Sequence, residues 1–135
     1  GALAFWAPKI FADYREKLGV LLQHDPSLKF NYPNSIFPAT TFNLGPETVS
    51  LDHLDSGNVA AGMCPIFSAG RFNYKTGGHM IFFDLKKVVE FPPGSSMLVA
   101  SSITRHGNVP ILPGEERMSF TQYCAGGLLR YVSYG

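Results

Sequence analysis

Charge is scarce in this sequence and almost balanced in sign. Charged residues make up 16% of the chain, with 11 Lys and Arg against 10 Asp and Glu, which gives a net charge of +1. Totals of this kind provide no general electrostatic attraction to nucleic acid or to an anionic membrane surface. Any nucleic-acid binding would therefore have to rest on a local site.

Cysteine is also rare, with Cys64 and Cys124 as the two examples. Both lie among apolar or small residues, where free thiols usually serve as small core side chains. Two cysteines do not make a disulfide scaffold. We therefore expect both residues to be free thiols in the core.

Long apolar runs are missing as well. No stretch approaches the roughly 20 residues that a membrane-spanning helix needs, and no signal peptide is seen. The composition, with 45% hydrophobic and 13% aromatic residues, is that of a globular protein. We expect a single domain over residues 1–135, with no membrane association and an intracellular location (cytoplasm or nucleus) by default.

One helix is predicted near the start of the chain. From Pro8 onward, apolar residues recur at helical spacing, and Pro8 suits the first turn of a helix. The pattern predicts an amphipathic helix over residues 8–23 that packs its apolar face on the rest of the domain. Pro26, Pro33 and Pro38 then interrupt regular structure until about residue 39.

The remaining sequence has the pattern of an all-β domain. Short β-branched and aromatic runs alternate with Gly, Pro and Asn, and no long helical pattern separates them. This spacing predicts a β-sandwich over about 39–134, with a jelly roll, or double-stranded β-helix, as the best fit to the strand count. The expected strands are Thr40–Phe42, Val49–His53, Met63–Ser68, His79–Leu85, Val88–Phe91, Met97–Ser101, Ile103–Arg105, Arg117–Cys124 and Leu128–Tyr134.

Three residues have the spacing of a metal site. His53 and Asp55 stand at i and i+2, so on an extended segment their side chains project to the same face. His106 follows about fifty residues later. Two histidines and one carboxylate form the facial triad of non-haem Fe(II) oxygenases, which leaves coordination positions open for an oxoacid and O2. An H-x-D triplet alone is common in surface turns, so the order and spacing of all three residues carry this prediction.

A further pair indicates a co-substrate. Arg117 lies eleven residues after His106, and Ser119 again stands at i+2. A guanidinium fork beside a hydroxyl suits a carboxylate that is bound by two parallel hydrogen bonds in a narrow barrel. The pair therefore predicts an anchor for the distal carboxylate of 2-oxoglutarate.

The other histidines have simpler interpretations. His79 begins a strand-like run, and we expect a structural residue at a strand edge rather than a fourth ligand, although it could line the pocket. His24 follows the predicted helix, where a positive charge interacts favourably with the helix dipole.

These motifs resemble the 2-oxoglutarate/Fe(II)-dependent dioxygenase superfamily, over about residues 40–125. Further runs are similar to a group of fungal proteins with this fold, distantly related to the TET and JBP thymine and 5-methylcytosine hydroxylases. Those runs are Gly77–Leu85, Glu90–Gly94, His106–Pro110, Gly114–Tyr123 and Gly126–Val132. The resemblance implies a double-stranded β-helix that needs Fe(II), 2-oxoglutarate and O2.

By this resemblance, His53, Asp55 and His106 match the metal ligands, and Arg117 with Ser119 matches the 2-oxoglutarate anchor. Asn58, Asn108 and His79 also fall within the fungal pattern, where they could line the pocket, and have no assigned role. The expected activity is hydroxylation of a C–H bond in an unidentified substrate, with a nucleobase as the leading candidate. Two alternatives stay open: a non-catalytic metal-binding β-sandwich or pseudo-enzyme, and a cupin-type dioxygenase that uses no oxoacid.

Overall fold

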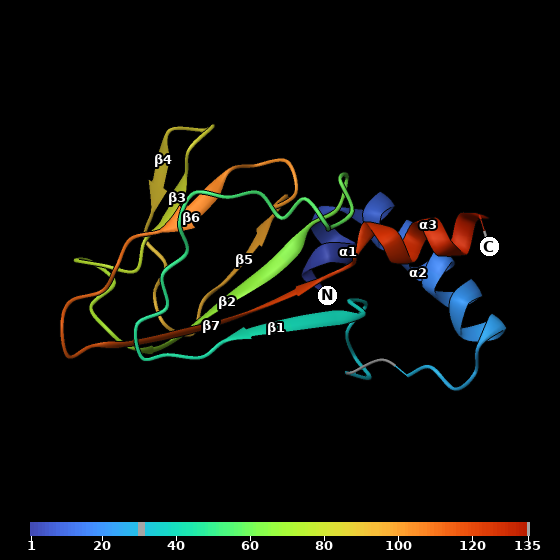
Figure 1. The fold of residues 1–135 in the computed structure, drawn as a ribbon, viewed down its shortest axis with the longest axis horizontal. Helices are drawn as coiled ribbons and strands as arrows, with labels where there is room; N and C mark the ends of the chain where they lie inside the picture. The colour runs from blue at the N-terminus through green and yellow to red at the C-terminus, as the bar shows by residue number, and fades with distance from the viewer. Residues whose placement is uncertain (30–31, 135) are drawn as a thin grey trace.

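The structure is a computed structural model that describes residues 1–29 and 32–134. Two helices precede the strands and one follows them (Figure 1). The elements are α1 (Ala2–Trp6), α2 (Pro8–His24), β1 (Ala39–Asn43), β2 (Cys64–Arg71), β3 (Met80–Phe82), β4 (Lys87–Val89), β5 (Ser96–Val99), β6 (His106–Asn108), β7 (Glu116–Tyr123) and α3 (Gly126–Tyr134). No helix within the described residues is long and apolar enough to cross a membrane.

The strands form two antiparallel sheets. A four-stranded sheet has the order β1-β7-β2-β5, and a three-stranded sheet has the order β4-β3-β6. Neighbours in the larger sheet are far apart in sequence, because the last strand, β7, lies between the first two. The fold is mainly β and jelly-roll-like, as the sequence predicted. The single-domain organisation stays a prediction.

Strand β7 provides one wall of the interior. Successive residues of a strand point to opposite faces, so Arg117, Ser119 and Thr121 share one face. In the register of the β1–β7 pair, Asn43 lies opposite Ser119 and Thr41 opposite Thr121. The inner face of these two strands therefore carries hydroxyl, amide and guanidinium groups instead of the aliphatic side chains usual in a sandwich core.

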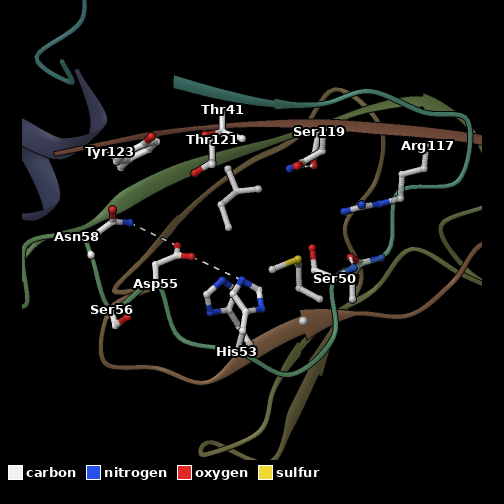
Figure 2. A pocket seen from close by; sticks show the side chains of 17 residues that line it. Thr41, Ser50, His53, Asp55, Ser56, Asn58, Arg117, Ser119, Thr121 and Tyr123 are labelled. Carbon is white, nitrogen blue, oxygen red and sulfur yellow. Dashed lines mark hydrogen bonds and ion pairs between the residues drawn. The ribbon is translucent and has the colours of Figure 1, made fainter. Parts of the chain in front are cut away.

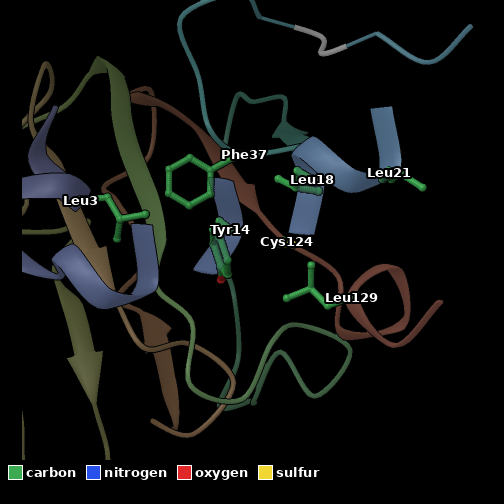
Figure 3. Packing of buried hydrophobic residues seen from close by; sticks show 7 residues of the cluster. All are labelled: Leu3, Tyr14, Leu18, Leu21, Phe37, Cys124 and Leu129. Carbon is green, nitrogen blue, oxygen red and sulfur yellow. The ribbon is translucent and has the colours of Figure 1, made fainter. Parts of the chain in front are cut away.

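The helices gather at one end of the molecule, beyond the ends of β1, β2 and β7 (Figure 1). There a compact apolar cluster joins both termini of the chain to the sheet (Figure 3). Its buried members are Leu3, Tyr14, Leu18, Leu21, Phe37, Cys124 and Leu129. Burial, as the main cause, raises the pKa of the Cys124 thiol to about 11 and raises that of the Tyr14 hydroxyl. Both groups are therefore neutral core side chains at physiological pH.

The two ends of the chain differ from the sequence prediction. The helix expected over 8–23 is present as α2, but α1 precedes it, so the chain has two N-terminal helices instead of one. The strand predicted for 128–134 is wrong, because this segment lies in α3. The aromatic and β-branched residues there favour a strand locally. However, Leu129 and Val132 stand at i and i+3, so in a helix Leu129 joins the apolar cluster and Val132 packs against it.

Two predicted strands inside the domain are also wrong. Residues 49–53 form a loop, although His53 makes an isolated antiparallel bridge with His106. Residues 103–105 belong to a turn, in which the N–H groups of Ile103 and Thr104 both donate to the carbonyl of Ala100. The strand begins only at His106. Both segments lead directly to a histidine of the predicted metal site.

Candidate metal centre

The structure brings together the three predicted metal ligands. The ligand atoms of His53, Asp55 and His106 all lie within 4.8 Å of one another. His53 Nε2 is 3.5 Å from Asp55 Oδ1. His106 is buried, with 4% of its surface exposed, while the other two residues are half-buried. The site thus has a closed side at His106 and an accessible side.

The backbone holds the two histidines next to each other. The N–H of His53 donates to the carbonyl of His106, and the N–H of His106 donates to the carbonyl of His53, each at 3.0 Å. The two ring centroids are 4.3 Å apart. The N–H of Asp55 donates to the carbonyl of Ser101, which places the third ligand against the turn that precedes β6. All three ligands are therefore fixed by main-chain hydrogen bonds to other segments.

Both imidazole rings are held in the tautomer that a metal site needs. Nδ1 of His53 lies 2.7 Å from the carbonyl oxygen of Leu51, and Nδ1 of His106 lies 2.9 Å from that of Thr104. A carbonyl oxygen only accepts, so each Nδ1 carries the proton and donates it. The lone pair then sits on Nε2, as expected for a metal-binding histidine whose other nitrogen is fixed by a hydrogen bond.

Asn58 supports the carboxylate ligand. Its Nδ2 donates to Asp55 Oδ2 at 3.4 Å and also lies 3.4 Å from the sulfur of Cys64. Oδ1, the other carboxylate oxygen, is the one that faces His53. Burial is the largest cause that raises the pKa of the Cys64 thiol, so this group is neutral at physiological pH. Cys64 consequently offers a weak acceptor to Asn58 instead of a thiolate ligand to the metal.

The chemistry of these donors fits a divalent iron ion. Two imidazoles and one carboxylate are the 2-His-1-carboxylate set that occurs at non-haem Fe(II) sites with open coordination positions. The tautomers and the hydrogen bond from Asn58 are the supporting interactions that such ligands usually have. The residues present are therefore able to hold Fe(II).

The ligands open into a cavity of about 370 Å³ between the two sheets. Figure 2 shows Arg117 at one end of this cavity and Asn58 at the opposite end, with His53 between them. The lining residues are Thr41, Asn43, Ser50, His53, Asp55, Ser56, Gly57, Asn58, Ile66, Met80, His106, Gly107, Asn108, Arg117, Ser119, Thr121 and Tyr123. Most of them are polar, so the cavity is built for ligands that form hydrogen bonds.

Arg117 is the buried cation of this cavity. Only 2% of its surface is exposed. One guanidinium nitrogen, Nη1, donates to the Thr48 carbonyl at 3.3 Å and lies 3.1 Å from the Thr48 hydroxyl oxygen. The Nε–H group has no hydrogen-bond partner, and among the described residues no carboxylate forms an ion pair with Arg117.

This arrangement leaves a positive charge without compensation. Burial lowers the pKa of Arg117, but a guanidinium remains charged at physiological pH. A buried charge with an unused donor is costly unless an anion neutralises it. Ser119, the predicted supporting residue, is 9% exposed, lines the cavity and accepts a hydrogen bond from Asn43 Nδ2 at 3.1 Å. This end of the cavity is therefore suited to an anionic ligand group.

The three residues that could line the pocket differ in their positions in the structure. Asn58 and Asn108 both line the cavity, whereas His79 is not among the lining residues, and its strand neighbour Met80 is. His79 was expected to be a structural residue that could line the pocket; it lies outside the lining, because the alternation of side chains on this segment directs Met80 inward. The carbonyl of His79 accepts a hydrogen bond from the N–H of Val109, which is a structural role.

Sequence reasoning missed several residues of the cavity. Thr121 and Tyr123 could have been found, because they continue the period-two pattern that places Arg117 and Ser119 on one face. Thr48, the partner of Arg117, has no such signal. It lies in a loop, and its position depends on long-range pairing between this loop and β7.

Comparisons with known proteins support the fold. No protein-family model matches the chain, and no curated protein matches it. Among solved structures, NgTET1 in complex with 5mC DNA matches with a TM-score of 0.61 and 21% identity, over 79% of this chain and 42% of that chain. The chain therefore spans less than half of that protein. At this identity the likeness establishes a similar fold.

Two more distant structures also match. A viral collagen prolyl hydroxylase from Paramecium Bursaria Chlorella virus-1, solved as a 2OG complex, has a TM-score of 0.44 and 16% identity, over 82% of this chain and 70% of that chain. An RmlC-like cupin protein from Desulfovibrio desulfuricans has a TM-score of 0.37 and 13% identity, over 71% and 95% of the two chains.

Proposed function

We propose that this chain is an Fe(II)- and 2-oxoglutarate-dependent dioxygenase that hydroxylates a C–H bond of an unidentified substrate. One observation carries the proposal: Arg117, a buried cation without an anionic partner among the described residues, opens into the same cavity as the His53, Asp55 and His106 cluster. A metal site alone would not need this charge. A metal site that works with a dicarboxylic oxoacid needs it.

In this proposal, His53, Asp55 and His106 hold the ion. Fe(II), when bound, supplies the activation of O2 that couples oxidation of 2-oxoglutarate to substrate hydroxylation. Overall, one O2 and one 2-oxoglutarate yield succinate and CO2, and one oxygen atom enters the substrate C–H bond. The chain contributes the Nε2 atoms of His53 and His106, the Asp55 carboxylate and the cavity into which they open.

Arg117 binds the distal carboxylate of the co-substrate. Thr48 occupies Nη1, which leaves the unpartnered Nε–H and the remaining guanidinium donors for the ligand. A planar guanidinium suits a carboxylate that is bound by two parallel hydrogen bonds, and the interaction is strong where water is excluded. Ser119, on the same face of β7, offers a hydroxyl next to this site.

The opposite end of the cavity is proposed to receive the substrate. Beyond the metal ligand Asp55, its lining there includes Thr41, Ser56, Asn58 and Tyr123, whose side chains are polar and uncharged. This supports a substrate whose reacting part is neutral and forms hydrogen bonds. A nucleobase meets this condition, and the solved NgTET1 structure contains 5mC DNA. Nucleobases in DNA are therefore the first class to assay, although the net charge of +1 gives no support to extensive contacts with a nucleic-acid backbone.

Succinate formation tests the proposal. Metal-replete protein is incubated with 2-oxoglutarate, alone and with candidate substrates that include 5mC-containing DNA. We expect succinate in the wild type and none above background in Arg117→Met. Arg71→Met is the matched control, because Arg71 lies in a neighbouring strand but is exposed and pairs with Glu116.

Two other outcomes would overturn the proposal. Tight metal binding without any effect of 2-oxoglutarate would favour a non-catalytic metal-binding module. Oxygen consumption that needs the metal but neither Arg117 nor an oxoacid would favour a cupin-type dioxygenase.

A further inference from the structure

A short loop segment, residues 46–50, lies between the two sheets at the Arg117 end of the cavity, and we call it the strap. On one side it is attached to β7: the N–H of Arg117 donates to the carbonyl of Pro46 at 2.6 Å, and the N–H and hydroxyl of Thr48 donate to the carbonyl of Arg117 at 3.4 and 3.2 Å. These bonds hold the strap to the larger sheet.

On the other side the strap is attached to β6 by a single residue, Asn108. Its backbone N–H donates to the carbonyl of Ser50 at 2.9 Å, while its side-chain Oδ1 accepts from the N–H of Ser50 at 2.7 Å. Its Nδ2 donates to the carbonyl of Thr48 at 3.2 Å. Asn108 is 7% exposed, so these bonds form in a largely dry environment, where polar groups need partners.

Asn108 and Arg117 share one acceptor. The carbonyl oxygen of Thr48 receives Nδ2 of Asn108 and also Nη1 of Arg117, at 3.2 and 3.3 Å. A carbonyl oxygen has two lone pairs and can serve both donors. The Thr48 carbonyl therefore fixes the position of Arg117 Nη1. Asn108 in turn fixes this carbonyl from the β6 side.

We propose that Asn108 is a positioning residue for the anion-binding guanidinium. By fixing Thr48, it orients the fork of Arg117 toward the cavity and so sets the affinity for the distal carboxylate of the oxoacid. This inference rests on the proposed function, because it takes 2-oxoglutarate as the ligand of Arg117. Asn108 does not belong to the metal cluster, so its effect falls on the oxoacid and not on the metal.

The contacts predict what happens when Asn108 is changed. The hydrogen bonds to β7 remain, and so does the backbone bond from the N–H of residue 108 to the Ser50 carbonyl, but the side-chain bonds that tie Thr48 and the Ser50 N–H to β6 are weakened or lost. Arg117 keeps its charge, but Nη1 loses a fixed acceptor, and the fork becomes less well ordered. Because a two-point carboxylate interaction depends on orientation, affinity falls without loss of the fold.

Binding measurements on Asn108→Ala and Asn108→Asp test this proposal. Asn108→Asp preserves the size of the side chain and the acceptor for the Ser50 N–H. It is therefore the variant to measure if Asn108→Ala does not fold. Protein loaded with Mn(II), which supports no turnover, is titrated with 2-oxoglutarate in a calorimeter, and Mn(II) alone is titrated into metal-free protein. Asn73→Ala, an exposed turn residue outside the cavity lining, is the control.

We expect the Kd of 2-oxoglutarate to rise about ten-fold in both Asn108 variants, as for the loss of one well-placed hydrogen bond. When Mn(II) is titrated into the metal-free Asn108 variants, its Kd should stay within about two-fold of the wild-type value. With Fe(II) and turnover, KM for 2-oxoglutarate should rise while kcat at saturation is retained.

Two results would overturn the inference alone: an unchanged Kd for 2-oxoglutarate, or a parallel loss of Mn(II) and 2-oxoglutarate affinity, which would indicate a general structural role. Wild-type protein that binds Mn(II) but no 2-oxoglutarate would overturn the proposed function and this inference with it.

Discussion

His53 and His106 exchange hydrogen bonds in both directions through their backbones, each N–H donating to the other's carbonyl at 3.0 Å. The residues are more than fifty positions apart in sequence, yet this bridge places their rings 4.3 Å apart. The pairing of the His53 loop with β6 therefore brings the two candidate ligands together. A metal ion would bind to a site that is already arranged, so little conformational entropy is lost on binding.

The first prediction concerns the metal ligands. We expect His106→Ala to lower the affinity for Mn(II) or Fe(II) by at least about a hundred-fold, beyond the 10- to 100-fold typical of supporting residues. His79→Ala is the matched control, since His79 is half-buried in the adjacent strand region but is not among the cavity-lining residues. Calorimetric titration under anaerobic conditions measures both. Equal losses in the two variants would contradict the assignment of His106 as a ligand.

The second prediction is that the buried, uncompensated charge of Arg117 lowers the stability of the ligand-free protein. The guanidinium of Arg117 is 2% exposed and has an unpartnered Nε–H, and such a buried donor costs about 1–3 kcal/mol. In ligand-free protein, Arg117→Met should therefore raise the free energy of unfolding by up to about 2 kcal/mol, since its contacts with Thr48 are also lost. Urea denaturation measures this change. A clear decrease would mean that Arg117 serves mainly as a structural residue.

Ligand addition sharpens this test. With metal present, 2-oxoglutarate at about 100 times its Kd should stabilise the wild type by about 2.7 kcal/mol and leave Arg117→Met unchanged. Arg71→Met should behave like the wild type in both conditions, because an exposed ion pair contributes little.

The third prediction is a loss of stability at alkaline pH. Burial raises the pKa of Cys124 from its ordinary value of 9.0 to about 11, so between these values the folded chain keeps a proton that the unfolded chain releases. The contribution of Cys124 to the free energy of unfolding should therefore be constant below about pH 9 and fall by about 2 kcal/mol as the pH rises to about 11. Chemical denaturation at several pH values measures it.

Cys124→Ala is the control for this pH dependence. It should flatten the decline but not abolish it, because burial also raises the pKa values of Cys64 and Tyr14. A decline that is as steep in Cys124→Ala as in the wild type would contradict the assignment to this thiol.

The fourth prediction concerns two glycines in the loop that carries Asp55. A Cβ added at Gly62 would collide with the hydroxyl oxygen of Tyr14 and lie 2.9 Å from the carbonyl oxygen of Val59, whereas one added at Gly57 would meet nothing within 4 Å. Gly62→Ala should therefore lower the free energy of unfolding by about 1–3 kcal/mol, and Gly57→Ala should leave it nearly unchanged. Thermal and urea unfolding of the two variants compare them directly. Similar values would show that the loop adjusts freely around Tyr14.

Local patterns in the sequence were sufficient for several parts of this protein. The helix over 8–23 follows from the recurrence of apolar residues at helical spacing, and the all-β character of the remainder follows from short runs between turn residues. Arg117 and Ser119 stand at i and i+2 of β7, so strand geometry alone places this pair on one face, whereas His53 and Asp55, at the same spacing, lie in a loop. These features depend on backbone periods that neighbouring residues determine.

Other parts were decided only by tertiary structure. Residues 128–134 form a helix because Leu129 meets the apolar cluster from that side, and Met80 rather than His79 faces the cavity because of the strand's orientation in its sheet. The contact between the two histidines, and the Thr48 carbonyl that Asn108 and Arg117 share, join segments that are distant in sequence. Sequence spacing therefore determined which side chains could act together. The pairing of strands and loops decided which of them meet, because register between distant segments is set by packing and hydrogen bonds across the whole fold.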